Sequence, residues 1–224
     1  MIVPIVIAIA ALIVFGAMLH KRSKRADEIR EVLEELGFHD ARHDPHDGLD
    51  FTVTVQWPEA RGIRYQSYFT KREDNSMVTV ANIGCYQIAG AKMGRLGAAM
   101  KMDEIEQTVV GVKFTAQTVP RFGVYPRAIE GQVREMCDGL EKLKTDDCDL
   151  ERQYTIITRE RDSVLRIFTS DIRRAMTDVA KVTLEAGNHS IMLYRQATVL
   201  SAVELRRVLG LAETFQRHIA ATYA

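Results

Sequence analysis

The side chains best suited to chemistry lie in one short polar stretch, residues 38–50. Imidazoles and carboxylates are common ligands of divalent metal ions in proteins. The candidate ligands are His39, His43, Asp44, His46 and Asp47. Pro45 and Gly48 lie among them and, with the aspartates, are typical of an exposed turn. The stretch is therefore a metal site or a turn, and the turn is the simpler interpretation because structural zinc sites usually include cysteine.

A second stretch with possible chemistry is the glycine-rich run Gly90–Gly97, which reads Gly-Ala-Lys-Met-Gly-Arg-Leu-Gly. A phosphate-binding loop requires a Gly-Lys-Ser/Thr ending, and a dinucleotide fingerprint requires G-x-G-x-x-G. Neither spacing occurs here. The run therefore predicts a loop of small residues, and no nucleotide is expected.

The other histidines and the cysteines form no recognisable catalytic set. The histidines lie beside an apolar segment, beside a predicted turn and on a terminal helix, and they are His20, His189 and His218. His20 has the chemistry of a haem or pigment ligand, but an interfacial polar residue explains it more simply. The cysteines, Cys85, Cys137 and Cys148, are odd in number and lack C-x-x-C spacing, as expected of reduced thiols. We expect a non-catalytic protein without a cofactor.

An apolar segment, Met1–Leu19, opens the chain and contains no charged side chain. At ~1.5 Å per residue a helix of this length reaches roughly 28 Å, close to the ~30 Å hydrocarbon core of a bilayer. We expect a transmembrane helix over residues 1–20. A cleaved signal peptide would carry its basic residues before the apolar run, and a buried core helix would have a polar face, so both alternatives fit less well.

A basic segment, residues 21–25, follows the apolar one. Its cations are Lys21, Arg22, Lys24 and Arg25. Basic residues flanking a span stay in the cytoplasm and attract anionic lipid headgroups. This arrangement predicts a single-pass protein of the bacterial inner membrane, with its N-terminus outside and its C-terminal domain in the cytoplasm. Small residues available for helix contact within the bilayer are Ala8, Ala10, Ala11, Gly16 and Ala17, although G-x-x-x-G is absent.

The overall charge gives no reason to expect nucleic acid as a partner. Lys plus Arg equals Asp plus Glu, at 30 each, so the only concentrated positive patch is the juxtamembrane one. The rest of the chain suffices for one or two compact domains. We divide it into a β-rich region, residues 26–119, and an α+β region, residues 120–224.

In the first region, apolar residues at helical spacing predict a helix over residues 26–36 that Gly37 ends. Alternating or β-branched runs then predict an antiparallel meander. Its strands are expected at residues 49–57, 63–70 and 77–88, and residues 109–119 again have strand-like composition.

The second region predicts a helix over 128–143, a strand over 154–158 and short helices ending near 167 and 179. The first short helix would be capped by Asp162 or Ser163, and the second by Thr169 or Ser170. A hairpin is expected over 181–196, with Gly187-Asn188 at the turn, Val182 opposite Leu193 and Leu184 opposite Ile191.

The final helix should begin at Ser201, because Ser201-Ala-Val-Glu204 has the spacing of a capping box. Its apolar stripe should pack on the sheet. The stripe consists of Leu205, Val208, Leu209, Ala212, Phe215 and Ile219.

Three short motifs follow one another along this second region. They are Pro120-Arg-Phe-Gly-Val-Tyr-Pro126, Phe168-Thr-Ser-Asp-Ile-Arg-Arg174 and Leu193-Tyr-Arg195. Over roughly residues 120–221 the chain resembles a family of uncharacterised bacterial membrane-associated proteins with an N-terminal membrane segment. The resemblance implies an α+β cytoplasmic region at a membrane and implies no activity or site residue.

The fold class expected is therefore α+β, with one N-terminal transmembrane helix followed by an antiparallel sheet and covering helices. The function expected is that of a non-catalytic, membrane-anchored accessory subunit that docks partners in a larger membrane complex. The alternatives are a membrane-tethered sensor for a small molecule or metal and, further off, an unrecognised enzyme.

Overall fold

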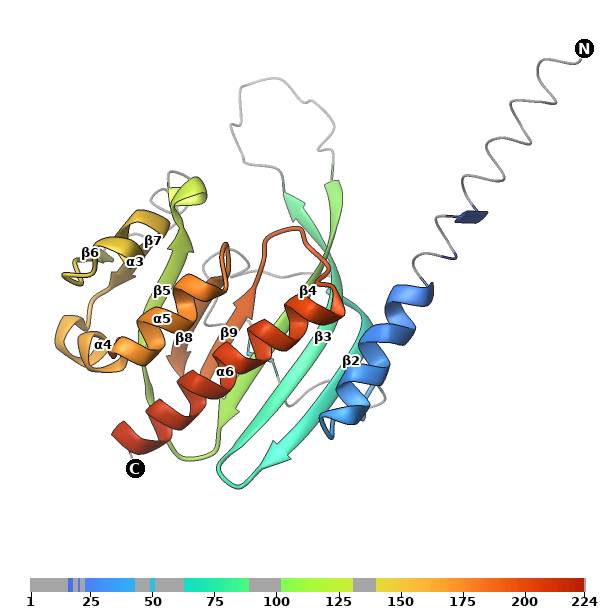
Figure 1. The fold of residues 1–224 in the computed structure, drawn as a ribbon, viewed down its shortest axis with the longest axis horizontal. Helices are drawn as coiled ribbons and strands as arrows, with labels where there is room; N and C mark the ends of the chain where they lie inside the picture. Colours follow the sequence, from blue (N-terminus) through green and yellow to red (C-terminus); the bar gives the residue numbers. More distant parts are fainter. Residues whose placement is uncertain are drawn as a thin grey trace, which may run out of the picture.

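The computed structural model describes residues 16–17, 20, 23–42, 49–50, 63–88, 102–130 and 140–223. Its strands form one nine-stranded sheet in the order β1-β2-β3-β4-β9-β8-β5-β7-β6, and every neighbouring pair is antiparallel. Figure 1 shows α4, α5 and α6 in front of this sheet, with an unlabelled helix beside β2. The expected α+β fold with an antiparallel sheet is confirmed.

The sheet joins the two regions of the chain, because β4 pairs with β9. The strands are β1 (His39–Asp40), β2 (Arg64–Glu73), β3 (Ser76–Ile88), β4 (Met102–Phe114), β5 (Val119–Pro126), β6 (Glu141–Leu143), β7 (Tyr154–Thr158), β8 (Thr183–Asn188) and β9 (Ser190–Tyr194). The labelled helices are η2 (Arg127–Ile129), α3 (Cys148–Gln153), α4 (Arg161–Ile167), α5 (Ser170–Asp178) and α6 (Ala202–Thr222). Of the predicted strand over 49–57, residues 51–57 lie outside the described part of the chain.

The unlabelled helix, residues 23–35, confirms the predicted helix after the basic segment. Gly37 adopts a φ of +80°, a left-handed conformation that glycine accepts without strain. The N–H of Phe38 donates to the Leu33 carbonyl at 2.8 Å and that of Gly37 to the Glu34 carbonyl at 3.0 Å. This is a Schellman ending, and its usual apolar contact is present because Leu33 and Phe38 share one buried cluster.

The final helix, α6, begins as the sequence predicts. Ser201 accepts from the N–H of Glu204, while Glu204 accepts from the N–H of Ser201 at 2.9 Å. The predicted stripe is buried, and Leu211 joins it. Phe215 meets the ring of Phe168 edge-on at 6.2 Å, and Phe168 meets that of Phe122 at 5.7 Å, which links α6 to the sheet.

The predicted helix over 128–143 is wrong at its C-terminal end. Glu141–Leu143 form strand β6 at the edge of the sheet, with Leu143 opposite Ile156. Leu143 is buried in the main apolar cluster. Pairing with β7 satisfies backbone groups and buries this side chain, and these tertiary gains outweigh the helical spacing.

The predicted register of the hairpin is also wrong, by two residues. Gly187 pairs with Ser190 and Leu184 with Leu193, so the turn is Asn188-His189. Asn188 takes a φ of +55°, which asparagine tolerates better than most residues. Because side chains alternate with period two, the shift keeps Leu184 and Leu193 on the apolar face that was predicted.

The caps of the two short helices differ from the prediction. The residue before α4 is Glu160 instead of Asp162 or Ser163, and it makes no side-chain cap. Thr169 precedes α5 as expected, again without a side-chain cap. The helix α3 was not expected from the sequence, and Asp147 caps it by accepting from the N–H groups of Asp149 and Leu150.

Candidate functional site

The predicted metal ligands fall only partly within the described residues. His39 lies in β1 and is exposed, while His43, Asp44, His46 and Asp47 lie outside the described residues. Beside it, Asp40 binds Arg42 at 2.7 Å, and the hydrogen bond from the Arg42 side chain holds the pKa of Asp40 below its usual value. Across the described ranges, no three His, Cys, Asp or Glu side chains are grouped to hold a metal ion.

The predicted membrane segment also lies mostly outside the described residues. Gly16, Ala17 and His20 are helical and exposed, and Lys24 and Arg25 lie in the helix of residues 23–35. Ala8, Ala10, Ala11, Lys21 and Arg22 are not described. Of the helices that the structure describes, none combines the length and the apolar character needed to cross a membrane.

Polar contacts fix both ends of the helix 23–35 to the domain. Near its start, the guanidinium of Arg25 donates to the carbonyl of Val199, in the loop before α6. Near its end, Glu35 binds Arg206 on α6. Between them Ile29 and Leu33, which are 3% and 0% exposed, join the main apolar cluster. The helix is therefore an integral part of the layer that covers the sheet.

A buried carboxylate lies on the other face of the sheet, away from the main cluster. Glu185, in β8, has no solvent-exposed surface. The phenol of Tyr125, from β5, donates to its Oε1 at 2.6 Å, and that of Tyr194, from β9, donates to Oε2 at 2.9 Å. We call these three residues the tyrosine–glutamate cluster. It connects three adjacent strands through side-chain hydrogen bonds.

Gly123 makes the position of Tyr125 possible. It lies opposite Glu185 in the β5–β8 pairing, and a Cβ placed on it would lie 2.3 Å from the Tyr125 ring. The ring therefore lies over the glycine and reaches the carboxylate. Burial, and then the negative charge of Glu185, raise the pKa of Tyr194 well above its usual value, so this phenol keeps its proton.

The buried position of Glu185 could have been predicted from the alternation of side chains along its strand. Leu184 and Ala186 face the helices, so Glu185 between them must point to the opposite face of a strand that is buried on both sides. A buried acid needs hydrogen-bond donors, but which tyrosines supply them depends on the long-range pairing of β5, β8 and β9.

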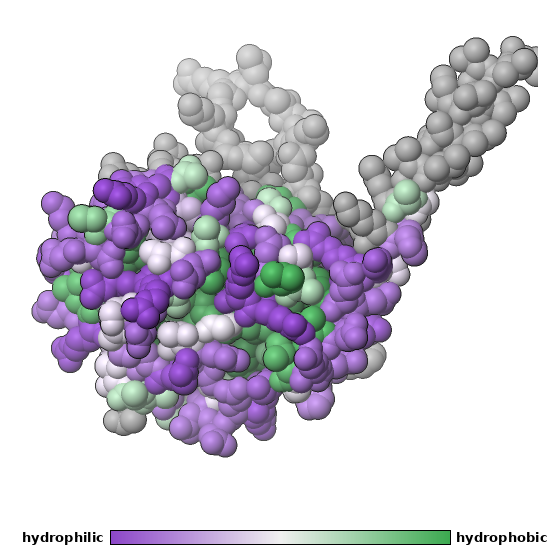
Figure 2. Space-filling view, viewed as in Figure 1, coloured by the Kyte–Doolittle hydropathy of each residue, from purple (hydrophilic) through white to green (hydrophobic). Residues whose placement is uncertain are grey.

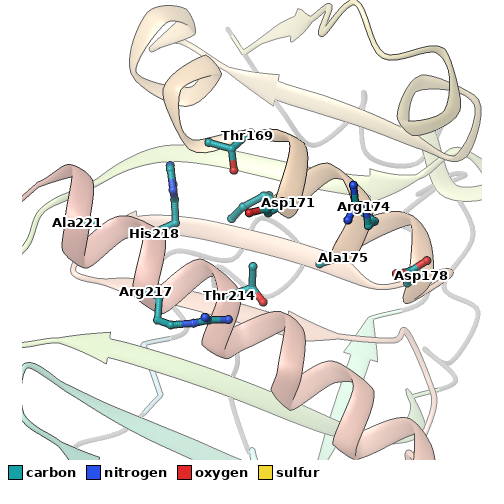
Figure 3. Close-up of a pocket in the computed structure, with 10 residues that line it drawn as sticks. Thr169, Asp171, Arg174, Ala175, Asp178, Thr214, Arg217, His218 and Ala221 are labelled. Carbon is teal, nitrogen blue, oxygen red and sulfur yellow. The ribbon is translucent and has the colours of Figure 1, made fainter.

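An open groove runs between α5 and α6. One described part has a volume of about 440 Å³ and adjoins a second part of about 470 Å³ through Ala175 and Asp178, which line both. Figure 3 shows the two helices side by side, with His218 pointing from α6 toward Thr169 at the start of α5. We call the whole feature the α5–α6 groove.

The charges along the α5–α6 groove are mostly cationic on α6 and mixed on α5. Arg207, Arg217 and His218 lie on α6, whereas Asp171, Arg174 and Asp178 lie on α5. The Nε2 atom of His218 is 3.0 Å from the Arg166 carbonyl. In the described part of the chain the three arginines form no salt bridge with a carboxylate. Guanidinium groups bind carboxylates in a planar, two-point geometry, so this groove favours an acidic partner.

The remaining candidates from the sequence do not come together. His189 lies at the hairpin turn, with Nδ1 2.8 Å from the Gln117 carbonyl. Cys148 is a free, exposed thiol at the start of α3. Neither residue contacts the tyrosine–glutamate cluster or lines the α5–α6 groove.

The chain matches no family model, no curated protein and no solved structure.

Proposed function

We propose that this protein is a non-catalytic accessory subunit of a larger membrane complex, anchored by residues 1–20, with its α+β domain docking partner proteins in the cytoplasm. The observation that carries the proposal is the attachment of the helix 23–35 to the domain. This helix begins within the basic segment, and its apolar side chains pack into the same cluster as α6.

The strength of this attachment matters for function. Ile29, Leu33 and Phe38 are all at most 5% exposed, and burying such a side chain contributes about 1.5–3 kcal/mol. Three such side chains, together with the contacts of Arg25 and Glu35, hold this helix against the domain more firmly than a flexible linker would. An anchor continued by this helix would present the domain at a fixed height and angle, as an accessory subunit requires.

The test of topology uses the exposed thiol of Cys148. In intact spheroplasts a membrane-impermeant maleimide should leave Cys148 unlabelled, and permeabilisation should allow labelling. An epitope at the N-terminus should show the opposite behaviour. Labelling of Cys148 in intact spheroplasts would contradict the proposed orientation, and recovery of the full chain in the soluble fraction would contradict the anchor.

The test of the accessory role is assembly. Extracted in mild detergent, the chain should migrate in native gels with a complex much larger than itself and should co-purify with other membrane proteins. Migration as a lone monomer would contradict this role. In that case the tethered sensor becomes the better hypothesis, with the α5–α6 groove as the place to look for a small ligand.

A further inference from the structure

The α5–α6 groove has features that packing within this chain does not explain, and they concern the solvent side of α6. From these features we infer that the groove binds an amphipathic α-helix of a partner subunit, oriented with its acidic residues toward α6. This inference rests on the proposed accessory function and assigns the partner to one surface.

The solvent side of α6 carries a stripe with the spacing of one helical face. Its members are Val203, Arg207, Gly210, Thr214, Arg217 and Ala221. They lie opposite the buried stripe, which faces the sheet. At ~1.5 Å per residue, the distance from residue 203 to residue 221 is roughly 27 Å, enough for five helical turns of a partner. Val203 is 63% exposed, the highest value among large apolar side chains in the described part of the chain.

Gly210 is the feature that points to a close partner. Glycine inside a helix costs about 1 kcal/mol relative to alanine. A Cβ on Gly210 would meet nothing within 4 Å, and its φ is not in the left-handed region. Neither packing nor backbone conformation in the described residues therefore requires glycine here. Close approach of another helix backbone would favour glycine here, and Ala175 and Thr214 are small neighbours on the two sides.

The apolar surface that a partner helix could cover in the groove is small. Ile172 and Leu211, which line its two parts beside Ala175, are at most 1% exposed and are therefore already buried. Figure 2 shows this side of the molecule, with white and green surface between strongly hydrophilic side chains. A partner helix lying between α5 and α6 would contact Ala175 with its apolar side and keep its polar side in solvent.

The charges on the two walls of the groove determine the orientation of the partner helix. Arg207 and Arg217, on the α6 wall, are exposed and form no salt bridge with a described carboxylate. Asp171 and Asp178 lie on the α5 wall, with Arg174 between them in sequence. A partner helix with Glu or Asp on the side facing α6 and a basic residue facing α5 complements this pattern, and the reverse orientation places like charges together.

The first experiment is photo-crosslinking in native membranes. The full chain carries a benzophenone amino acid at the position of Arg174, which is exposed on the α5 wall of the groove, or, as a control, at the exposed position of Glu213 on the adjoining side of α6. We expect a discrete adduct with another protein from position 174 and a much weaker one from 213. The crosslinked peptide should be a helical segment with acidic residues at three- to four-residue spacing. Adducts with lipid, with a second copy of this chain or with a basic segment would overturn the inference.

The second experiment blocks the groove. Gly210→Trp fills it, and Glu213→Trp, which places the same side chain at an exposed position outside the groove lining, is the matched control. We expect Gly210→Trp, and separately Arg207→Glu with Arg217→Glu, to lower recovery of the crosslinked partner about tenfold, which corresponds to about 1.4 kcal/mol. Arg152→Glu, an exposed charge reversal on α3, should leave recovery unchanged. The arginine variants test the inference even if the tryptophan variant folds poorly.

The outcomes separate the inference from the proposed function. If the chain remains in a large complex while position 174 gives no protein adduct and the blocked variants assemble normally, the groove is not the docking site and the accessory function still stands. If no large complex forms with the unsubstituted chain, the proposed function and the inference both fall.

Discussion

The phenol of Tyr125 and the carboxylate of Glu185 are 60 residues apart in sequence and 2.6 Å apart in space. The hydrogen bond between them crosses from β5 to β8 on the face of the sheet opposite α6. Tyr194 completes the arrangement from β9, so both oxygens of a fully buried carboxylate accept a phenol hydrogen. The buried carboxyl group is therefore satisfied by donors that only the folded sheet brings together.

Removing one of these donors should destabilise the fold. Tyr125→Phe or Tyr194→Phe deletes only the hydroxyl and leaves one carboxylate oxygen without its phenol. We expect each change to lower the free energy of unfolding by about 1–3 kcal/mol, measured by urea unfolding of the purified chain in detergent. Tyr223→Phe is the control, because its hydroxyl is only partly buried, and it should cost about 0.5–1.5 kcal/mol. Equal losses at all three positions would contradict a special role for the cluster.

Two glycines should respond to alanine in opposite directions. Gly123→Ala forces a methyl group against the Tyr125 ring and should cost about 1–3 kcal/mol. Gly210→Ala adds a methyl group in open space on a helix and should stabilise by about 1 kcal/mol. A double-mutant cycle checks the cause, because in a Tyr125→Ala background Gly123→Ala should lose most of its cost. An unchanged cost there would show that the clash is not with Tyr125.

The helix 23–35 should depend on Leu33 for its attachment. Leu33→Ala removes a fully buried side chain and should cost about 2–5 kcal/mol. Amide hydrogen exchange should rise across residues 23–35 because this helix loses its apolar contact with the domain. Glu34→Ala, at an exposed neighbouring position, should stay within about 0.5 kcal/mol. Unchanged exchange in Leu33→Ala would mean that the polar contacts alone hold the helix.

The capping box of α6 should make stability depend on acid pH. The N–H of Ser201, and then its hydroxyl, hold the pKa of Glu204 below the ordinary value of 4.5. The unfolded chain therefore takes up this proton first as pH falls. The stabilisation is complete above that ordinary value and is lost as pH falls through the lower folded pKa. Glu204→Gln should cost about 1 kcal/mol near neutral pH and progressively less in acid. A constant difference across the acid range would exclude the carboxylate as the cause.

Local signals in the sequence were sufficient where short-range physics decides the structure. Ser201 with Glu204, Gly37, and the strand Tyr154–Thr158 were predicted because a cap, a left-handed stop and a β-branched run each act within a few residues. The edge strand at Leu143 was missed because its partner, Ile156, lies beyond an intervening helix. The tyrosine–glutamate cluster and the α5–α6 groove were missed for the same reason, since both arise from pairing and packing between distant elements.

The pairing of β4 with β9 also determines when the sheet can be completed during synthesis. The strand β9 lies in the middle of the sheet, yet it is the last strand to leave the ribosome. Until then β4 presents an unpaired edge, which invites pairing with other chains. Such long-range closure is slow compared with the local β2–β3–β4 meander. We therefore expect nascent chains truncated before residue 190 to need a chaperone at this edge, a demand that ends once Ser190–Tyr194 has emerged.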